Sequence, residues 1–400
     1  MVAARKPSKL NVMLVPNSKH KLQKNPLRTA CWIASLITTV QIKISPSKSF
    51  RNNRNYATKV LVILIRILLS TAFVISMIFI HQLIPSVAVT VTMYATNICG
   101  FVLRFVFWAK RREISSSLAQ LCQISYGLNP RNVIGNKYIN AFLVFFFIDI
   151  TASLCGMVYL FFKLEWEHFK SSLELPFGVP FGNKDACVVF ILICALLSVT
   201  CSGCTCLAGL LLCDGTYQTL SNVIRSYRVI LAKKLKTHEF SAFIHTENKT
   251  LKTIVSLVEN VDQALNMCAL LQYCMFTSLI FVTISVAITN EKIFRTNIVI
   301  GFLVWNFMSA FLLFFGITMR GSKVHEEGEI LKKIGLECSN EMSFLNEKDK
   351  SFLPLFLFLG NLKDLNLRVT GGGMFVIGRS LFLTITNSLL TYGVILYQLN

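Results

Sequence analysis

The chain has 400 residues, of which 54% are hydrophobic and only 15% are charged, and its formal net charge is +20. This balance would leave the surface of a water-soluble protein short of polar groups, whereas it suits a chain surrounded by lipid. The basic excess gathers next to the apolar runs, where anionic lipid headgroups attract it, so no nucleic-acid partner is needed to explain it. Composition therefore excludes an ordinary soluble protein and indicates a polytopic membrane protein.

Seven apolar runs are long enough to cross a membrane, which takes roughly 20 residues for about 30 Å of hydrocarbon. They occupy residues 60–84, 87–108, 138–164, 186–213, 265–289, 298–319 and 374–399. The run Phe352–Leu362 has only about half the required length and contains Pro354, so we expect it in a cytoplasmic helix that packs on the bundle. The predicted fold class is an all-α membrane protein with seven transmembrane helices.

The basic residues predict the orientation, since Lys and Arg are retained on the cytoplasmic side. Of the 40 basic residues, 32 fall in four of the segments outside the runs and only 4 fall in the two other loops. The four basic segments are residues 1–59, 109–137, 214–264 and 320–372. This arrangement places the amino terminus in the cytoplasm and, after seven crossings, the carboxyl terminus outside the cell.

The same pattern divides the chain into four parts. The first 112 residues contain no Asp or Glu, but the amino-terminal segment is rich in proline and lacks a sustained amphipathic pattern, so we expect a cytoplasmic tail rather than a transit peptide. Leu220–Leu235 and Leu251–Leu265 place apolar residues three and four positions apart, which predicts helices that extend below the membrane. The predicted parts are a basic tail (1–59), six transmembrane helices with cytoplasmic extensions (60–319), a cytoplasmic anchor segment (320–372) and the seventh helix (373–400).

Catalytic and metal-binding motifs are not apparent. The chain has no Walker loop, no nucleophile elbow and no His-Glu-x-x-His motif, so neither an enzyme activity nor a cofactor is expected. The cluster Cys201-Ser-Gly-Cys204-Thr-Cys206 has the CxxC spacing of a zinc site, but the six scattered His residues supply no second half. We expect no metal, and these thiols should act as small apolar residues inside a span.

Asp149, Arg66 and Arg104 are ionisable residues within predicted spans. Asp149 lies about 16 Å along the third span, where a charge is costly unless it is paired, solvated or neutralised. A structural hydrogen bond and a place in a ligand cavity or ion path both stay open for it. Arg66 and Arg104 lie near the cytoplasmic ends of their spans, where their long side chains can reach the lipid headgroups.

The last span contains two polar side chains seven residues apart, Thr391 and Gln398. At about 100° per residue, seven steps return almost to the starting direction, so both side chains share one face of a helix. A hydrogen bond between helices of a membrane bundle and the lining of a pore both fit this pattern.

A resemblance to a known family rests on these residues. The ending Thr391-Tyr392, five residues and then Gln398 resembles the terminal Thr-Tyr-(five apolar)-Gln-Phe signature of insect and other arthropod gustatory receptors, a chemoreceptor family that also includes the odorant receptors. Upstream, Gly373-Met374-Phe375, three residues and then Arg379 resembles the segment that precedes the signature. Seven spans with an inside amino terminus agree with the resemblance over the whole chain.

Four positions depart from the family pattern. Leu399 stands where the family usually has Phe, and Tyr397 brings a phenol into a stretch that is usually aliphatic. Gly378 replaces a polar residue that often precedes the arginine, and Gly393 stands where sugar-responsive members often carry Glu. These departures put the detail of the gate in question and leave the ligand class open.

The resemblance implies a tastant-gated, non-selective cation channel in the plasma membrane of chemosensory neurons. It would be a homo-tetramer, or a hetero-tetramer with related receptors, that binds a small-molecule tastant, contacts membrane lipid and conducts cations through a central pore. Gln398 would line the narrow extracellular part of the pore and Leu399 would form a hydrophobic constriction, while residues 371–373 would separate the anchor segment from the pore helix. Thr391 and Tyr392 would set helix packing and the lower pore lining. The pore and gate residues implied in this way are Thr391, Tyr392, Ile395, Gln398 and Leu399.

The same resemblance implies that the agonist binds in a cavity that opens outward among the second to sixth spans. Aromatic walls with a few polar groups suit small-molecule pockets, although Tyr and Trp near a membrane interface also serve as anchors. The candidates for this pocket are Tyr94, Asp149, Tyr159, Trp305 and Asn306.

Two other functions are compatible with several membrane spans. A metabotropic seven-span receptor would need an outside amino terminus, and its usual Asp-Arg-Tyr and Asn-Pro-x-x-Tyr motifs are absent from the expected spans. A secondary transporter would show two related halves with interrupted helices, and the sequence contains no such repeat.

Overall fold

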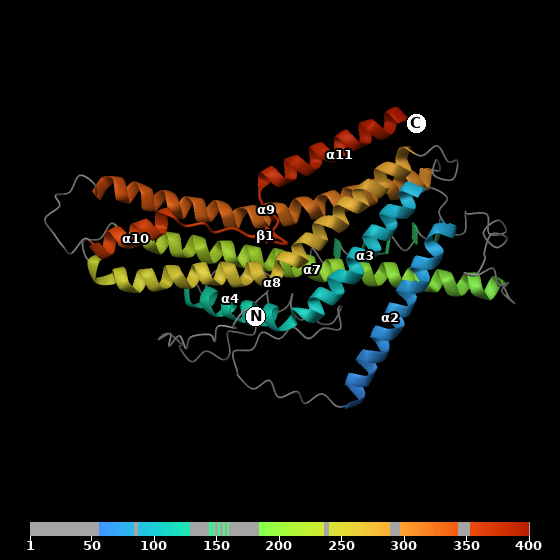
Figure 1. The fold of residues 1–400 in the computed structure, drawn as a ribbon, viewed down its shortest axis with the longest axis horizontal. Helices are drawn as coiled ribbons and strands as arrows, with labels where there is room; N and C mark the ends of the chain where they lie inside the picture. Colours follow the sequence, from blue (N-terminus) through green and yellow to red (C-terminus); the bar gives the residue numbers. More distant parts are fainter. Residues whose placement is uncertain are drawn as a thin grey trace, which may run out of the picture.

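The computed structural model describes residues 56–83, 87–128, 184–235, 240–288, 297–342 and 353–399, with short pieces between 144 and 159. Within these residues the chain is almost entirely helical (Figure 1). Most of the predicted cytoplasmic tail and much of the third predicted span, including Asp149, lie outside the described residues.

The described elements follow the predicted spans closely at the start of the chain and less closely towards its end. Two short strands pair antiparallel, with Thr370 opposite Val376 and Gly371 opposite Phe375. In chain order the elements are α2 (Tyr56–Leu83), α3 (Val87–Ala109), α4 (Arg111–Leu128), α7 (Lys184–Leu235), α8 (Phe240–Ile288), α9 (Asn297–Met342), α10 (Leu353–Lys363), β1 (Thr370–Gly371), β2 (Phe375–Val376) and α11 (Arg379–Leu399).

Three helices are much longer than a membrane is thick. α7, α8 and α9 contain 52, 49 and 46 residues. At 1.5 Å per residue each spans about 70–80 Å, more than twice the hydrocarbon thickness. All three are long and apolar enough to cross a membrane, and α2 and α3 contain shorter apolar stretches. Each predicted span in this region therefore continues into its predicted cytoplasmic extension as one unbroken helix, and the chain is a multi-pass membrane protein.

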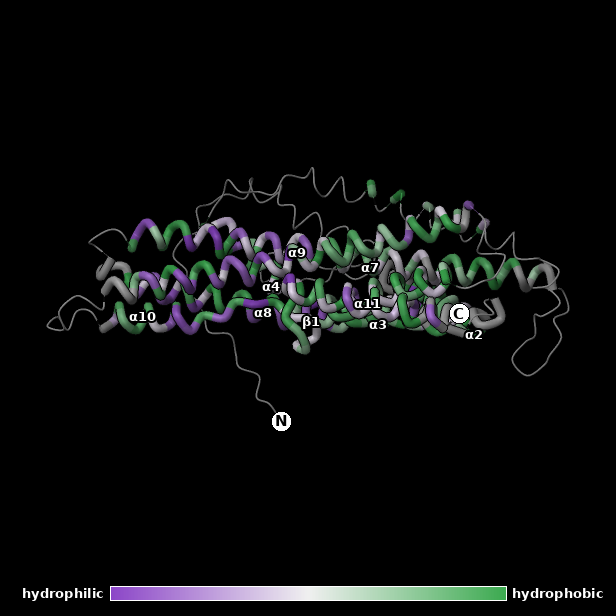
Figure 2. The backbone as a smooth tube through the Cα atoms, turned by 90° about the horizontal axis from the view of Figure 1, so that it is seen from above, coloured by the Kyte–Doolittle hydropathy of each residue, from purple (hydrophilic) through white to green (hydrophobic). Residues whose placement is uncertain are grey.

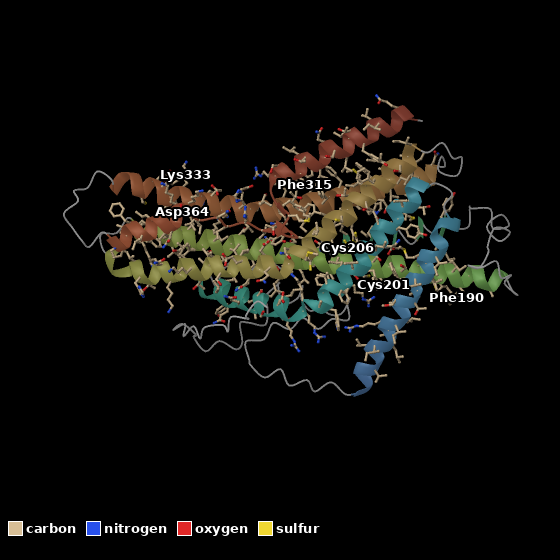
Figure 3. The ribbon with its side chains drawn as sticks, viewed as in Figure 1. Phe190, Cys201, Cys206, Phe315, Lys333 and Asp364 are labelled. Atoms are coloured by element: carbon tan, nitrogen blue, oxygen red, sulfur yellow. The ribbon has the colours of Figure 1, made fainter. Side chains whose placement is uncertain are left out.

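The main buried core lies where the long helices pack against α4, α10 and the hairpin. The large side chains of Tyr217, Tyr227 and Phe358 are fully buried there. Figure 2 shows hydrophilic residues concentrated in the half of the molecule that contains α10, with Lys333 and Asp364 in the same half in Figure 3. Apolar side chains inside and hydrophilic residues outside are the usual construction of a helix bundle in water. Burying one large apolar side chain there contributes about 1.5–3 kcal/mol.

The other half of the molecule turns apolar side chains outward. Ile67 on α2, Phe105 on α3 and Val304 on α9 are all more than half exposed. Phe190 of α7 lies in this half in Figure 3 and is also exposed. Lipid tails are themselves apolar, so exposure to them carries no hydrophobic penalty. The two halves of the same helices are therefore built for two different solvents.

α9 carries three buried glycines seven residues apart, at Gly321, Gly328 and Gly335. Seven residues are close to two helical turns, so the three glycines lie on one face. A Cβ on Gly328 would lie 2.9 Å from the Cβ of Leu367, and one on Gly335 would lie 2.7 Å from that of Leu362. A Cβ on Gly321 would overlap Ile377. This glycine stripe lets the chain from α10 to α11 lie in direct contact with α9.

Substitution of Gly328 by alanine tests the close contact. Gly328→Ala should lower the thermal unfolding temperature of the purified protein, because overpacking of this kind costs about 1–3 kcal/mol. Gly316→Ala on the same helix is the matched control, since a Cβ there meets nothing within 4 Å. Alanine is also the better helix former by about 1 kcal/mol. Equal unfolding temperatures for the two variants, measured by tryptophan fluorescence in detergent, would contradict the close packing.

Candidate functional site

A short hairpin between α10 and α11 fixes where α11 begins. Its turn contains Gly372 and Gly373, whose φ angles are +61° and +72°. Glycine adopts these angles without a steric cost, whereas other residues are strained there. The sequence predicted the seventh span from residue 374, but the chain up to Val376 belongs to the hairpin, and the helix begins at Arg379.

The hairpin is held on α8 by hydrogen bonds from its first strand and its turn. The carboxylate of Asp262 accepts the backbone N–H of Thr370 at 2.5 Å and its hydroxyl at 2.8 Å. One turn later along α8, the backbone carbonyl of Asn266 accepts the N–H of Gly372 at 2.8 Å. Asp262 lies in the predicted cytoplasmic segment, and burial raises the pKa of its carboxyl while the hydrogen bonds from Thr370 oppose this rise. These contacts attach β1 to a residue more than 100 positions earlier in the chain.

An aromatic contact joins the second strand to α8 and α9. The ring of Tyr273 on α8 lies edge-on to Phe375 of β2, with centroids 5.4 Å apart, and to Phe314 of α9 at 5.3 Å. Its hydroxyl forms a 2.7 Å hydrogen bond with the hydroxyl of Thr318 on α9. Aromatic pairs of this geometry contribute about 0.5–1.5 kcal/mol beyond the area that they bury. Tyr273 therefore links three elements at the junction.

An ion pair marks the first residue of α11. The Arg379 Nε lies 2.8 Å from one carboxylate oxygen of Glu326 on α9, and its Nη2 lies 3.0 Å from the other. Both side chains are partly exposed, at 63% and 39%, so solvent screens the attraction and the pair stabilises the fold only weakly. The two-pronged geometry joins the start of α11 to α9.

One face of α11 packs against α8 and α9. Phe382 contacts Phe311, Phe314 and Phe315 of α9, with ring centroids 5.2–5.6 Å apart. Figure 3 shows Phe315 on α9 close to the start of α11. Further along, Leu389 is buried against α8 and α9. Figure 1 shows α11 on the outer side of α9, with the carboxyl terminus at its far end.

The opposite face of α11 is exposed and mostly polar. At about 100° per residue, its six residues fall within about 40° of a single line along the helix. The hydroxyls of Thr384 and Thr391 donate to backbone carbonyls four residues earlier, at 3.0 and 2.9 Å, which leaves their oxygens able to accept from water. We call this face the outward stripe, and it consists of Ser380, Thr384, Asn387, Thr391, Val394 and Gln398, all exposed.

The predicted pore residues do not all lie on this face. Thr391 and Gln398 belong to the outward stripe, and Ile395 is exposed beside it. Tyr392 lies on the packed side, where its ring is edge-on to Phe281 of α8 with centroids 4.4 Å apart. The side chain of Leu399 lies outside the described residues.

Three polar residues of the outward stripe were missed by the sequence reasoning: Ser380, Thr384 and Asn387. The signal was present, because the seven-residue step from Gln398 back to Thr391 reaches Thr384 when it is taken once more. Ser380, Asn387 and Val394 repeat the same step four residues away. The glycine stripe of α9 has an equivalent signal in its own seven-residue spacing.

The pocket candidates are described unevenly. Tyr94 donates its hydroxyl to the backbone carbonyl of Met77 at 2.7 Å, which joins α3 to α2. The ring of Trp305 lies 6.1 Å from that of Phe145, so a described piece of the third predicted span contacts α9. Asn306, next to Trp305, donates to the Phe302 carbonyl of its own helix at 2.9 Å.

The remaining two pocket candidates are Tyr159 and Asp149. Tyr159 is half-buried, while Asp149 lies outside the described residues. Trp305 and Asn306 are adjacent on α9, and Tyr94 has a structural hydrogen bond to α2.

The attachment of the hairpin can be tested at Asp262. Asp262→Ala leaves the backbone N–H of Thr370 without its acceptor, and a lost buried partner costs about 1–3 kcal/mol, so the thermal unfolding temperature in detergent should fall. Asp262→Asn keeps one acceptor oxygen and should have a smaller effect. Glu259→Ala, an exposed carboxylate one turn earlier on α8, serves as the control. If Asp262→Ala unfolds at the same temperature as Glu259→Ala, these hydrogen bonds do not hold the hairpin.

Comparison with known proteins bears on the fold. No family model and no curated protein matches the chain. Among solved structures, it is similar to the insect olfactory receptor OR5 from Machilis hrabei in complex with eugenol, with a TM-score of 0.59 and 13% identity over 94% of this chain and 98% of that chain. A second structure of the same receptor gives a TM-score of 0.56 and 14% identity over 94% and 99%. The chain therefore has the fold of an insect olfactory receptor.

Proposed function

We propose that the chain is one subunit of a gustatory receptor, a tastant-gated and non-selective cation channel in the plasma membrane of chemosensory neurons. In this proposal four subunits, either copies of this chain or related receptors, surround a central pore, and α11 of each subunit lines it. The observation that carries the proposal is the outward stripe of α11, which is mostly polar, uncharged and uncovered by the other described residues.

The physical argument concerns the surroundings of this stripe. The amides of Asn387 and Gln398 need hydrogen-bond partners, and hydrocarbon supplies none. A lipid-facing helix would expose both amides to that penalty, whereas a water-filled pore between subunits would hydrate them. The packed face of α11 has the opposite character, with Phe382 and Leu389 directed at α8 and α9. The pattern supports an assembly in which several α11 helices share one aqueous axis.

The chemistry of the stripe fits weak ion selectivity. After Arg379, α11 contains no charged residue. Hydroxyl and amide groups can replace part of the hydration shell of a cation, but they lack the full charge that strong discrimination between ions requires. Val394, Ile395 and Leu399 lie near the carboxyl end, where apolar side chains around a narrow axis can block ions by expelling water.

Two further observations support a ligand-gated receptor. The fold is shared with an olfactory receptor whose structure contains eugenol, a small molecule. The end of the chain carries the terminal signature described above for gustatory receptors. The proposal includes seven spans with a cytoplasmic amino terminus and an outward-opening tastant pocket, for which the candidates are Tyr94, Asp149, Tyr159, Trp305 and Asn306.

The contacts between α9 and the start of α11 offer a way for a tastant to act on the pore. α9 contains Trp305 and Asn306 near one end. Further along α9, Glu326 pairs with Arg379 at the start of α11. A small shift of α9 would therefore reach Arg379 through the ion pair and Phe382 through the aromatic contacts. The pair is exposed and weak, so it can change geometry at little cost. This mechanical link is the step by which ligand binding would open the pore.

Electrical recording tests the proposal directly. Cells that express the chain, alone or with a related receptor, should pass a cation current when a panel of tastants is applied. Gln398→Ala and Leu399→Ala should change leak, gating or permeability at unchanged surface expression, because both residues lie at the proposed constriction. Tastant responses that proceed only through G proteins, with both substitutions silent, would favour a metabotropic receptor instead.

Charge substitutions at Asn387 test the outward stripe itself. Asn387→Asp should raise the ratio of cation to anion permeability by about twofold or more, because a ring of four carboxylates attracts cations into the pore. Asn387→Lys should lower the ratio for the same reason. Gln123→Asp adds a charge at an exposed position on α4 and serves as the control. Reversal potentials unchanged by both Asn387 substitutions would exclude this face from the conduction path.

A further inference from the structure

Two arginines from different helices lie near one exposed tryptophan at the end of α3. The guanidinium of Arg66 on α2 is 5.9 Å from the centroid of the Trp108 ring, and that of Arg111, the first residue of α4, is 6.0 Å from it. Trp108 is 42% exposed, and the ring of the more exposed Phe105 lies 5.7 Å from it. We call Arg66, Trp108 and Arg111 the arginine–tryptophan cluster.

The cluster lies at the boundary between the two halves of the molecule. Around Arg66, the neighbouring side chains of Ile63 and Ile67 are exposed and apolar, as expected on a surface that faces lipid tails. Beyond Trp108 the chain turns polar, and Arg111, Arg112 and Glu113 are all exposed. A surface with apolar side chains on one side and cations on the other matches the headgroup level of a bilayer.

The charge at this boundary is strongly positive. Glu113 is the first acidic residue of the whole chain, so neither α2 nor α3 contributes a carboxylate. Lys110 is directed elsewhere, because its amine donates to the backbone carbonyl of Gln263 on α8 at 2.6 Å. Basic side chains beside a membrane attract anionic lipid headgroups, each by about 1 kcal/mol.

We propose that the arginine–tryptophan cluster binds the phosphate of an anionic phospholipid headgroup at the basic, cytoplasmic-facing end of the bundle. Guanidinium groups present paired N–H donors that match phosphate oxygens. The indole ring lies within 6.0 Å of both guanidinium groups and covers the glycerol region of the lipid. The exposed side chains of Phe105, Ile63 and Ile67 contact the acyl chains, which is why the ligand is a lipid and not a free phosphate.

Native mass spectrometry of the full chain in detergent, with phosphatidylglycerol or phosphatidylcholine added, tests this site. The unmodified protein should retain phosphatidylglycerol in preference to phosphatidylcholine. The double variant Arg66→Gln with Arg111→Gln should lower that retention by about tenfold or more, since each basic side chain near an anionic surface contributes a factor of about five. Arg225→Gln removes an exposed arginine from the distant half of α7 and should change nothing.

Two further variants keep the test independent of folding in the double variant. Arg111→Lys preserves the charge and should retain most of the lipid, whereas Trp108→Leu preserves the apolar surface and should lose part of it. Equal retention of the two lipids by the unmodified protein would overturn the proposal. So would a normally folded double variant that retains phosphatidylglycerol fully, or displacement of the lipid by an equal concentration of glycerol 3-phosphate. The site does not depend on the channel function.

Discussion

The position of α11 depends on how closely the preceding chain can approach α9. At Gly321, Gly328 and Gly335 the missing Cβ atoms leave the space that Ile377, Leu367 and Leu362 occupy. With this contact made, β1 comes within reach of Asp262 on α8, and the turn can bond to Asn266. Arg379 then emerges beside Glu326, and Phe382 meets the aromatic side chains of α9. These contacts follow one another along the chain, so the glycine stripe of α9 is the close approach on which the placement of α11 rests.

The second constraint is that α7, α8 and α9 pass through two solvents. In the water-facing half their apolar residues gather on the inside, and the fully buried Tyr217, Tyr227 and Phe358 belong to that core. In the lipid-facing half the apolar residues also cover the outside. The rule that apolar side chains are buried therefore holds along only one part of each of these helices. Against this background the outward stripe of α11 is anomalous, because it places polar groups on an outer face next to apolar side chains such as Leu383 and Leu390.

The sequence predicted the long helices well because length, hydropathy and three-and-four spacing are local signals. Leu220–Leu235 and Leu251–Leu265 were expected as helices and are the continuations of α7 and α8. The hairpin was not predicted, since two-residue strands carry no pattern and Asp262, which holds them, lies 108 positions before Thr370. The apolar residues 374–377 were assigned to the last span, although the glycine turn commits them to β2 and its contacts. The terminal motif alone does not say which side of α11 each residue takes, and Tyr392, expected to set helix packing, lies on the packed side against Phe281.

The outward stripe and the packed face impose different demands on α11, and together they explain its construction. The packed face must hold the helix on α8 and α9, and it does so with aromatic and aliphatic contacts that tolerate small sliding movements. The outward face must find water or partners, and its hydroxyls already bond to their own helix, so the amides of Asn387 and Gln398 carry the remaining demand. In the proposed tetramer that demand is met only when several subunits surround a common axis. Assembly and conduction would then depend on the same six residues, and any movement of α9 that tilts α11 would alter both the seal between subunits and the width of the path.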